Sequence, residues 1–429
     1  MQKRSSFSGK LGFVLAAAGS AVGLGNIWRF PYLAAKYGGG TFLFIYLILA
    51  VTFGFTLMTA EIAIGRKTGL SAIGAFTILD KRFKFLGILA SAVPIIIFPY
   101  YSVIGGWVVK YFFVFVTGSG HTAAGDSYFT DFIGGTFEPI GWFFLFIAVT
   151  AVIVGFGVEQ GIEKVSKFMM PILVLLTLFV ALYGLTIDGA MDGLSYYLKP
   201  HMADVSAKTI LAAMGQLFYS MSLAMGIMIT YGSYMKKENH LESSVRQIEI
   251  FDTGVAFLAG LMIIPAVFSF SGGDSSALQA GPGLMFITLP KVFGNMKFGN
   301  VVGTVFFLLV FFAALTSAIS LVETIVSILR DKLGWTRKGT CVFVTILALV
   351  MGVPSSLGFG PLSFISWMGM SVLDIMDFVS NSVLMPIVAF FTCIFIGFVI
   401  KPSTIADEVK VTDGTFKGEK LFAVMIKWI

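Results

Sequence analysis

Charged residues are scarce in this chain of 429 residues. Asp, Glu, Lys and Arg together make up 12% of it, and hydrophobic residues make up 57%; ordinary soluble domains are about 25% charged. Long apolar runs recur, for example over residues 308–319 and 387–400. These features exclude an ordinary soluble protein and predict an all-α polytopic membrane protein. The net charge of +6 is scattered over loops and does not indicate a nucleic-acid partner.

Residues that commonly carry enzyme chemistry are also few. The two cysteines, Cys341 and Cys393, lie in apolar runs without disulfide or metal spacing, so we expect both to be buried by packing. The three histidines fall in predicted loops: His121, His201 and His240. The chain contains no His-Glu-x-x-His or Gly-x-Ser-x-Gly motif, and its Gly-Leu-Gly at 23–25 lacks the third glycine and the strand of a dinucleotide site. We therefore expect neither an enzyme nor an organic cofactor.

The hydrophobic segments predict ten complete membrane spans, each about 20 residues or longer except the ninth. They lie near residues 11–35, 41–65, 86–117, 140–157, 165–187, 208–235, 248–271, 300–329, 339–353 and 363–400. We expect loop 272–299 to fold as a lid. Residues 401–429 are expected to form a cytoplasmic loop and the start of an eleventh span that the sequence cuts off.

Basic residues in the loops predict the orientation. Lys and Arg gather before the first span and after the second, sixth and eighth, whereas the 118–139 loop has none. The positive-inside rule places the N-terminus in the cytoplasm. We expect a multi-pass protein of the plasma (inner) membrane, in contact with the lipid bilayer.

The first span contains an unusual polar stretch at residues 19–26, Gly-Ser-Ala-Val-Gly-Leu-Gly-Asn. Glycine costs roughly 1 kcal/mol per site relative to alanine in a helix, so this stretch predicts a break. Backbone groups freed inside a membrane are tolerated only when they are buried in protein or line a cavity. The sixth span repeats the anomaly with Ser220, Ser222 and Gly226.

Two interrupted helices, each opening a set of five spans, predict an inverted repeat. One transport domain over residues 1–429 would contain a first repeat at 11–187 and a second at 208–400. Such paired breaks point to a binding site near the bilayer midplane. An ion channel using the same polar breaks and an intramembrane enzyme are the alternatives. Polar side chains at the breaks would otherwise form helix–helix contacts or bond to their own backbone.

Motifs along the whole chain resemble the neurotransmitter:sodium symporter family, in particular its bacterial leucine and hydrophobic-amino-acid transporters. After residues 19–26 they are Ile27-Trp28-Arg29-Phe30-Pro31-Tyr32, Gly38-Gly39-Gly40, Glu61-Ile62-Ala63-Ile64-Gly65-Arg66, Tyr100-Tyr101, Gly215-Gln216-Leu217-Phe218, Thr230-Tyr231-Gly232-Ser233-Tyr234, Ala313-Ala314-Leu315-Thr316-Ser317 and Leu373-Asp374-Ile375-Met376-Asp377. The resemblance implies a 5+5 inverted-repeat transporter fold with discontinuous first and sixth spans. It also implies sodium-coupled amino-acid uptake by alternating access, whereas oligomeric state stays open.

The resemblance implies two sodium sites built from oxygen ligands, which suit a hard cation. The first would use Ala21, Asn26, Ser220 and Asp252, completed by the substrate carboxylate. The second would use Gly19, Val22, Ala313, Thr316 and Ser317. The implied substrate residues are Ser20, Ala21, Leu24, Gly25, Ile97, Tyr101, Tyr219, Ser220, Ser222, Met225, Ser317 and Leu321.

Intramembrane charges are costly and usually functional. By resemblance, Arg29 and Asp377 form an outer gate. Arg4 and Asp331, supported by Tyr234, form an inner gate, although Phe7 stands where the family usually has Trp. Glu61 is expected to accept hydrogen bonds from the unwound part of the sixth span, and Glu323 has no assigned role.

The implied side-chain pocket contains no group charged at neutral pH, so we expect a neutral hydrophobic or aromatic L-amino acid as substrate. Chloride-dependent members of the family hold the anion beside the first sodium. Tyr46, Gln216 and Ser220 match that anion site, but Ala256 replaces its serine and Asp252 stands where Asn is common. A carboxylate there would supply the negative charge, so we expect transport independent of chloride.

Overall fold

The computed structural model describes residues 5–272 and 282–428. In these ranges the regular structure is helical, joined by turns and loops, apart from one bridge between Trp367 and Met370. The helices of the spans are α1 (Lys10–Ala21), η1 (Gly25–Arg29), α2 (Phe30–Lys36), α3 (Gly40–Leu49), η2 (Ala50–Gly54), α4 (Phe55–Thr68), η3 (Lys81–Phe83), α6 (Lys84–Val116), α9 (Phe137–Gly155), η4 (Val158–Glu163), α10 (Lys164–Gly184), α12 (Ala207–Ser220), α13 (Ile227–Gly232), α14 (Leu241–Ser271), α16 (Gly299–Leu333), α17 (Arg337–Leu357), α18 (Val372–Asp377), η8 (Phe378–Leu384), α19 (Met385–Ile394) and η9 (Phe395–Ile400). The connecting helices are α5 (Ala72–Leu79), α7 (Gly120–Ala123), α8 (Tyr128–Gly134), α11 (Ala190–Leu198), η5 (Met202–Asp204), η7 (Leu284–Thr288), α15 (Leu289–Gly294), α20 (Pro402–Asp413) and α21 (Glu419–Trp428).

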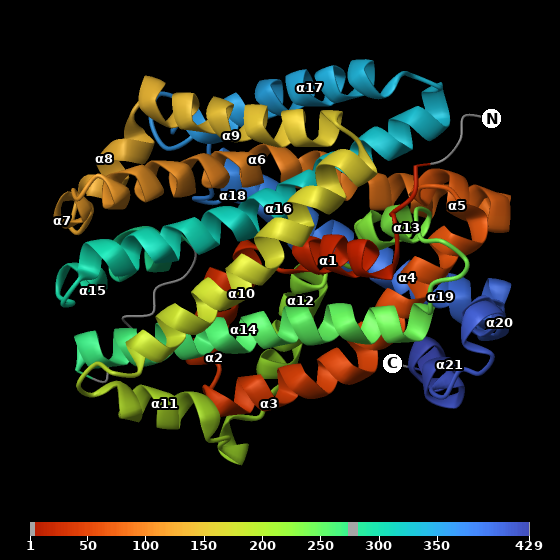
Figure 1. Ribbon diagram of the computed structural model, residues 1–429, viewed down its shortest axis with the longest axis horizontal. Coiled ribbons are helices and arrows are strands. Elements are labelled where there is room, and N and C mark those ends of the chain that lie inside the picture. Colours follow the sequence, from red (N-terminus) through yellow and green to blue (C-terminus); the bar gives the residue numbers. More distant parts are fainter. Residues whose placement is uncertain (1–4, 273–281, 429) are drawn as a thin grey trace.

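Among the described residues, eight helices are long and apolar enough to cross a membrane, or nine if the bent pair at 10–36 counts as one span. The predicted sixth span is the pair α12 and α13, whose halves are 14 and 6 residues long. Figure 1 shows the long helices running side by side. Helices α7, α8, α11 and α15 lie at one end of the bundle, and α5, α20 and α21 lie at the other.

Both predicted breaks are present. Helix α1 ends at Ala21, the chain resumes as a helix at Gly25, and the two halves are bent by 52°. Between α12 and α13 the backbone enters the left-handed region three times, at Ser222 (φ 53°), Ala224 (φ 60°) and Gly226 (φ 73°). Left-handed backbone at two non-glycine residues is costly, so packing around the break must hold it in place.

Glu61 supplies part of this support. Its carboxylate accepts a hydrogen bond from the Ala224 N–H at 2.8 Å, and the side chain is buried at 1% exposure. A backbone donor freed by the break is thereby satisfied inside the bundle. The predicted role of Glu61 toward the unwound part of the sixth span is confirmed.

The tenth span begins later than predicted. We expected a helix from residue 363, but α18 starts at Val372 and residues 358–371 are turns and irregular backbone. Met368 (φ 51°) and Gly369 (φ 77°) interrupt any helix there, and Ser371 caps α18 in a capping box with Asp374. The apolar side chains just before Ser371 made a turn look like part of the span.

The loop at 272–299 is folded where the structure describes it. Residues 273–281 lie outside the described part of the chain, and η7 and α15 follow them. Phe286 stacks on Phe129 with ring centroids 5.0 Å apart, and its carbonyl accepts a hydrogen bond from the Tyr111 hydroxyl at 2.9 Å. A folded segment packs on the bundle here, as predicted.

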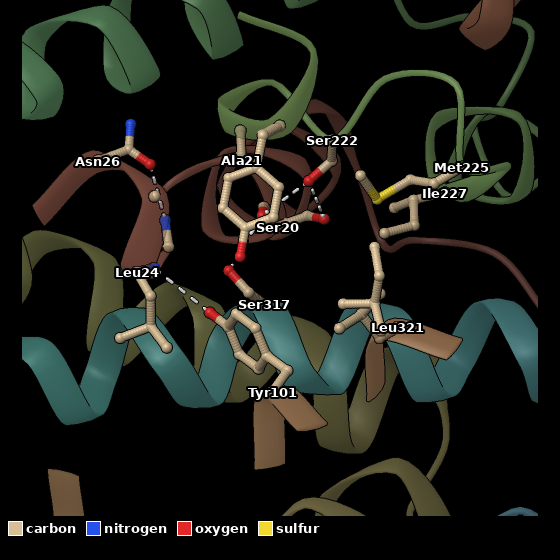
Figure 2. A pocket seen from close by; sticks show the side chains of 14 residues that line it. Ser20, Ala21, Leu24, Asn26, Tyr101, Ser222, Met225, Ile227, Ser317 and Leu321 are labelled. Atoms are coloured by element: carbon tan, nitrogen blue, oxygen red, sulfur yellow. Dashed lines mark hydrogen bonds between the residues drawn. The ribbon is translucent and has the colours of Figure 1, made fainter. Parts of the chain in front are cut away.

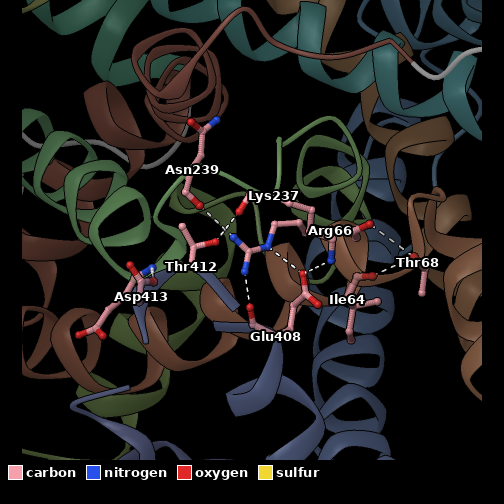
Figure 3. Close-up of polar contacts among 10 residues, drawn as sticks. Ile64, Arg66, Thr68, Lys237, Asn239, Glu408, Thr412 and Asp413 are labelled. Atoms are coloured by element: carbon pink, nitrogen blue, oxygen red, sulfur yellow. Dashed lines mark hydrogen bonds and ion pairs between the residues drawn. The ribbon is translucent and has the colours of Figure 1, made fainter. Parts of the chain in front are cut away.

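The segment at 401–429 contains helix α20, which the sequence did not lead us to expect. Figure 3 shows Arg66, at the end of α4, reaching into this helix. Arg66 forms an ion pair with Glu408 at 2.9 Å, and their side chains are 0% and 4% exposed. Arg66 also donates to the Asn239 carbonyl at 2.9 Å. Three segments far apart in the sequence therefore meet at one buried charge pair.

Candidate functional site

A small pocket lies where the two helix breaks face each other. Figure 2 shows its wall, which combines residues of the first break, α6, the second break and α16. The lining residues are Ser20, Ala21, Gly23, Leu24, Gly25, Asn26, Ile97, Tyr101, Tyr219, Ser222, Met225, Ile227, Ser317 and Leu321. All twelve predicted substrate residues except Ser220 are among them. Gly23 and Ile227 belong to the wall but were not predicted.

Close packing explains two of the glycines in the first break. A Cβ at Gly23 would lie 2.6 Å from Ser317 Oγ, and a Cβ at Gly25 would lie 2.5 Å from the Tyr219 ring. The cavity measures about 30 Å³, room for no more than a few water molecules. An amino acid can enter only if side chains of the wall move apart, and Tyr219 and the flexible Met225 are placed to do so.

The polar cluster predicted as the first sodium site is assembled next to this pocket. Asn26 Nδ2 lies 2.7 Å from Asp252 Oδ1 and 2.9 Å from Ser220 Oγ. The Ser220 hydroxyl donates to the Asp252 carboxylate at 2.9 and 3.0 Å. All three side chains are at most 1% exposed. Ala21 ends α1 and lines the pocket beside them.

Asp252 has a third partner in Tyr46. The Tyr46 hydroxyl donates to Asp252 Oδ2 at 3.3 Å. Gln216, which also matches the family's anion site, instead donates to the Gly25 carbonyl at 2.9 Å. Ala256 is buried and offers no hydroxyl. Two of the donors that would surround an anion, Tyr46 and Ser220, therefore converge on the Asp252 carboxylate, and hydrogen bonds of this kind stabilise its ionised form.

The residues predicted as the second sodium site also lie together. Ser317 Oγ lies 3.4 Å from the carbonyl oxygens of both Gly19 and Val22. A Cβ at Gly19 would meet the Thr316 side chain at 3.2 Å, so Thr316 borders the same place. The Thr316 hydroxyl bonds to its own helix at Phe312 and Ala313, at 2.9 and 3.2 Å. Carbonyl and hydroxyl oxygens, the ligands a hard cation prefers, are thus brought together.

Donors at the start of the outer half-helix face the pocket. The Leu24 N–H lies 3.3 Å from the Tyr101 hydroxyl, as Figure 2 shows. On the opposite wall, the Ser222 hydroxyl donates to the Ser20 carbonyl at 2.9 Å. One side of the pocket therefore offers donors at a helix N-terminus, which favours an anion, and the other offers oxygen atoms.

The predicted outer gate opens onto a vestibule of about 190 Å³ beyond Tyr219. Arg29 and Asp377 both line this vestibule, but the structure gives no ion pair between them. The Arg29 guanidinium lies 5.2 Å from the centre of the Tyr219 ring, a cation–π contact. Asp377 instead accepts hydrogen bonds from the Tyr100 hydroxyl at 3.0 Å and from Asn381 at 2.6 Å.

The predicted inner gate is only partly visible, because Arg4 lies outside the described residues. Asp331 accepts hydrogen bonds from the N–H and hydroxyl of Ser71, at 2.8 and 2.6 Å. The Tyr234 hydroxyl donates to Glu323 at 2.6 Å. Glu323 also forms an ion pair with Arg337, which gives the residue left unassigned by the sequence two partners.

Phe7 fills the position where the family usually has Trp. It is fully buried and packs edge-on against Phe13 and Tyr231, with ring centroids 5.7 and 5.6 Å apart. The Phe7 N–H lies 3.3 Å from the Tyr234 carbonyl. The N-terminal segment is therefore seated against the inner half of the sixth span.

Within the described residues, no group of three or more His, Cys, Asp or Glu side chains could hold a metal ion. The predicted sodium sites rest on the family motifs and contain one carboxylate between them. Their ligands are mostly hydroxyl, amide and carbonyl oxygens. Common residue types supply these atoms, and they do so at no distinctive spacing in the sequence. Sequence spacing alone would not have identified them.

Comparisons with known proteins agree on one family. A model of the "Sodium:neurotransmitter symporter family" matches residues 4–131 and 137–429. An uncharacterized sodium-dependent transporter of Bacillus subtilis is 37% identical over 98% of this chain and 93% of its own length. Another, from Methanocaldococcus jannaschii, is 35% identical over 90% of this chain and 80% of its own length. The crystal structure of MhsT in complex with L-phenylalanine superposes with a TM-score of 0.90, at 37% identity, and covers 99% of this chain and 97% of that one.

Proposed function

Because this chain belongs to the sodium:neurotransmitter symporter family and is a sodium-dependent membrane transporter rather than an enzyme, we propose that it takes up a neutral hydrophobic or aromatic L-amino acid together with sodium. The observation that carries this proposal is the Asn26–Ser220–Asp252 cluster beside a pocket with donors at one end and uncharged side chains elsewhere. Substrate and ion would share this space, so each would stabilise the binding of the other.

Two sodium ions would travel with each substrate in this scheme. The first would bind Ala21, Asn26, Ser220 and Asp252. The second would bind Gly19, Val22, Ala313, Thr316 and Ser317, at the C-terminal end of α1 where the helix dipole favours a cation. The proximity of Ser317 to both Gly19 and Val22 supports this assignment.

The substrate would bind with its carboxylate at the Leu24 and Gly25 N–H groups and the Tyr101 hydroxyl. Its ammonium group would face the carbonyls of Ala21, Tyr219 and Ser220 and the Ser222 hydroxyl. Ile97, Met225 and Leu321 would surround the side chain. No charged side chain lies among the lining residues, so a charged substrate side chain would lose its hydration without gaining a partner, at a cost of several kcal/mol.

A competition assay tests the substrate class. Uptake of labelled phenylalanine into proteoliposomes should be blocked by leucine, tyrosine and tryptophan, and left nearly unchanged by glutamate or lysine at the same concentration. Stronger competition from glutamate or lysine would reject an uncharged pocket. Saturable binding of labelled phenylalanine to the protein would also distinguish a transporter from a channel, because a channel needs no binding site for a solute.

Chloride would not be required, because Asp252 supplies the negative charge beside the first sodium ion. The three donors that converge on its carboxylate support this reading. We expect Asp252→Asn combined with Ala256→Ser to lose most uptake in gluconate buffer and to recover part of it in chloride. A double variant that stays inactive in both anions, while still binding phenylalanine, would contradict the charge substitution.

Alternating access requires gates on both sides of the pocket. We assign Arg29 and Asp377 to the outer gate and Arg4, Asp331 and Tyr234 to the inner one, with the N-terminus in the cytoplasm. The repeats would span residues 11–187 and 208–400. The open vestibule between Arg29 and Asp377 and the seating of Phe7 against the Tyr234 backbone support an arrangement closed toward the cytoplasm.

A further inference from the structure

A second cavity, separate from the substrate pocket, lies between α5, the start of α6 and the end of α16. Its volume is about 270 Å³, larger than that of the outer vestibule. Most of its wall is apolar, with Ile73 and Ile78 from α5 and Ile328 from α16. Apart from Asp331, which is assigned to the inner gate, no residue of its wall has a role in the transport mechanism.

The cavity opens near the edge of the membrane-spanning region. Lys84 is the first residue of α6, and the next turns expose Phe85 and Ile88 at 41% and 46% on the outside of the bundle. Ile78, in the cavity wall, is 66% exposed. Exposed apolar side chains on a membrane helix face hydrocarbon, whereas lysines collect at the headgroup level. The mouth therefore lies where headgroups meet acyl chains.

Two cationic side chains complete the wall. Lys84 and Lys332 both line the cavity, both are exposed, and neither forms an ion pair in the part of the chain that the structure describes. Nearby Arg82, by contrast, is paired with Asp80 at 2.8 Å. Asp331 also borders the cavity, but its carboxylate accepts the two hydrogen bonds from Ser71. With two lysines and one aspartate in the wall, the net charge around the cavity is positive.

We propose that this cavity binds an anionic phospholipid, with the headgroup phosphate between Lys84 and Lys332 and an acyl chain along Ile73, Ile78 and Ile328. A soluble anion would leave the apolar wall unused, and an uncharged apolar molecule would leave both lysines without a partner. Basic pockets between helices on the cytoplasmic side of a membrane are suited to such headgroups. Bound lipid would tie α6 to the end of α16 and stabilise the protein.

Thermal unfolding of the delipidated protein in a neutral detergent tests this site without any transport assay. Phosphatidylglycerol should raise Tm in a saturable way, whereas phosphatidylcholine and inorganic phosphate should not. Lys84→Gln with Lys332→Gln should raise the half-saturating phosphatidylglycerol concentration about tenfold or more, because each lysine near an anionic headgroup contributes substantially. Thr77→Trp, which fills the cavity and keeps both lysines, should abolish the effect.

A matched control separates this site from general attraction between charges. Lys67 and Lys338 are exposed residues that follow the second and eighth spans, as the cavity lysines do, but do not line the cavity. Lys67→Gln with Lys338→Gln should shift the half-saturating concentration less than twofold. Equal shifts for the two double variants would overturn the proposal. An equal Tm rise with phosphatidylcholine would do the same, and a rise with inorganic phosphate alone would indicate a soluble-anion site instead.

Discussion

Removing the carboxylate of Glu408 should destabilise the transporter strongly, although this residue lies far from the substrate pocket. Arg66 is completely buried and its guanidinium is satisfied by Glu408 and by the Asn239 carbonyl. Lys237 also pairs with the same carboxylate oxygen. Glu408→Ala would leave the Arg66 charge buried without its partner. Breaking a buried ion pair in this way costs about 3–5 kcal/mol.

The assay is chemical unfolding in detergent, followed by tryptophan fluorescence, with Glu419→Ala as the matched control. Glu419 pairs with Lys410 at 2.7 Å, but these side chains are 42% and 36% exposed. Exposed pairs contribute about 0–1 kcal/mol, so the control should change the free energy of unfolding little.

A compensating double variant checks the reason for the loss. Arg66→Met with Glu408→Leu removes both charges and should recover a substantial part of the stability, because apolar residues often replace a buried pair at little cost. Similar losses for Glu408→Ala and Glu419→Ala would refute the argument from burial. A double variant as unstable as Glu408→Ala would show that the charge left on Arg66 is not the cause.

Three further predictions concern the transport site. Thr316→Val with Ser317→Ala should raise the sodium concentration needed for half-maximal uptake at least tenfold, about 1.4 kcal/mol; an unchanged sodium dependence would remove the second ion site. Arg29→Ala should abolish uptake while equilibrium binding of phenylalanine stays measurable, and normal uptake would reject its role as a gate. Gly25→Ala, whose Cβ would lie 2.5 Å from the Tyr219 ring, should weaken phenylalanine binding about tenfold or more, whereas wild-type affinity would show that the ring moves freely.

The helix breaks could be predicted from the sequence because their cause is local. Gly19, Gly23 and Gly25 lower helix stability whatever surrounds them, and the hydroxyls of Ser220 and Ser222 do the same in an apolar span. Contacts across the bundle could not be derived in this way. Asn26 and Asp252 are 226 residues apart, and only the resemblance to the family suggested that they meet.

The partner of Arg66 was missed for the same reason, because nothing in the sequence links it to Glu408, 342 residues away. The start of the tenth span was placed too early because hydropathy cannot separate an apolar turn from a helix. Ser371, followed three residues later by Asp374, was the signal that marked the true start.

The most direct test of the account is sodium-driven uptake of labelled phenylalanine into proteoliposomes in chloride and in gluconate. We expect uptake that requires an inward sodium gradient and proceeds at the same rate in both anions. Uptake without a sodium gradient would contradict coupling at the Asn26–Ser220–Asp252 cluster. Uptake that collapses in gluconate would contradict the role of the Asp252 carboxylate.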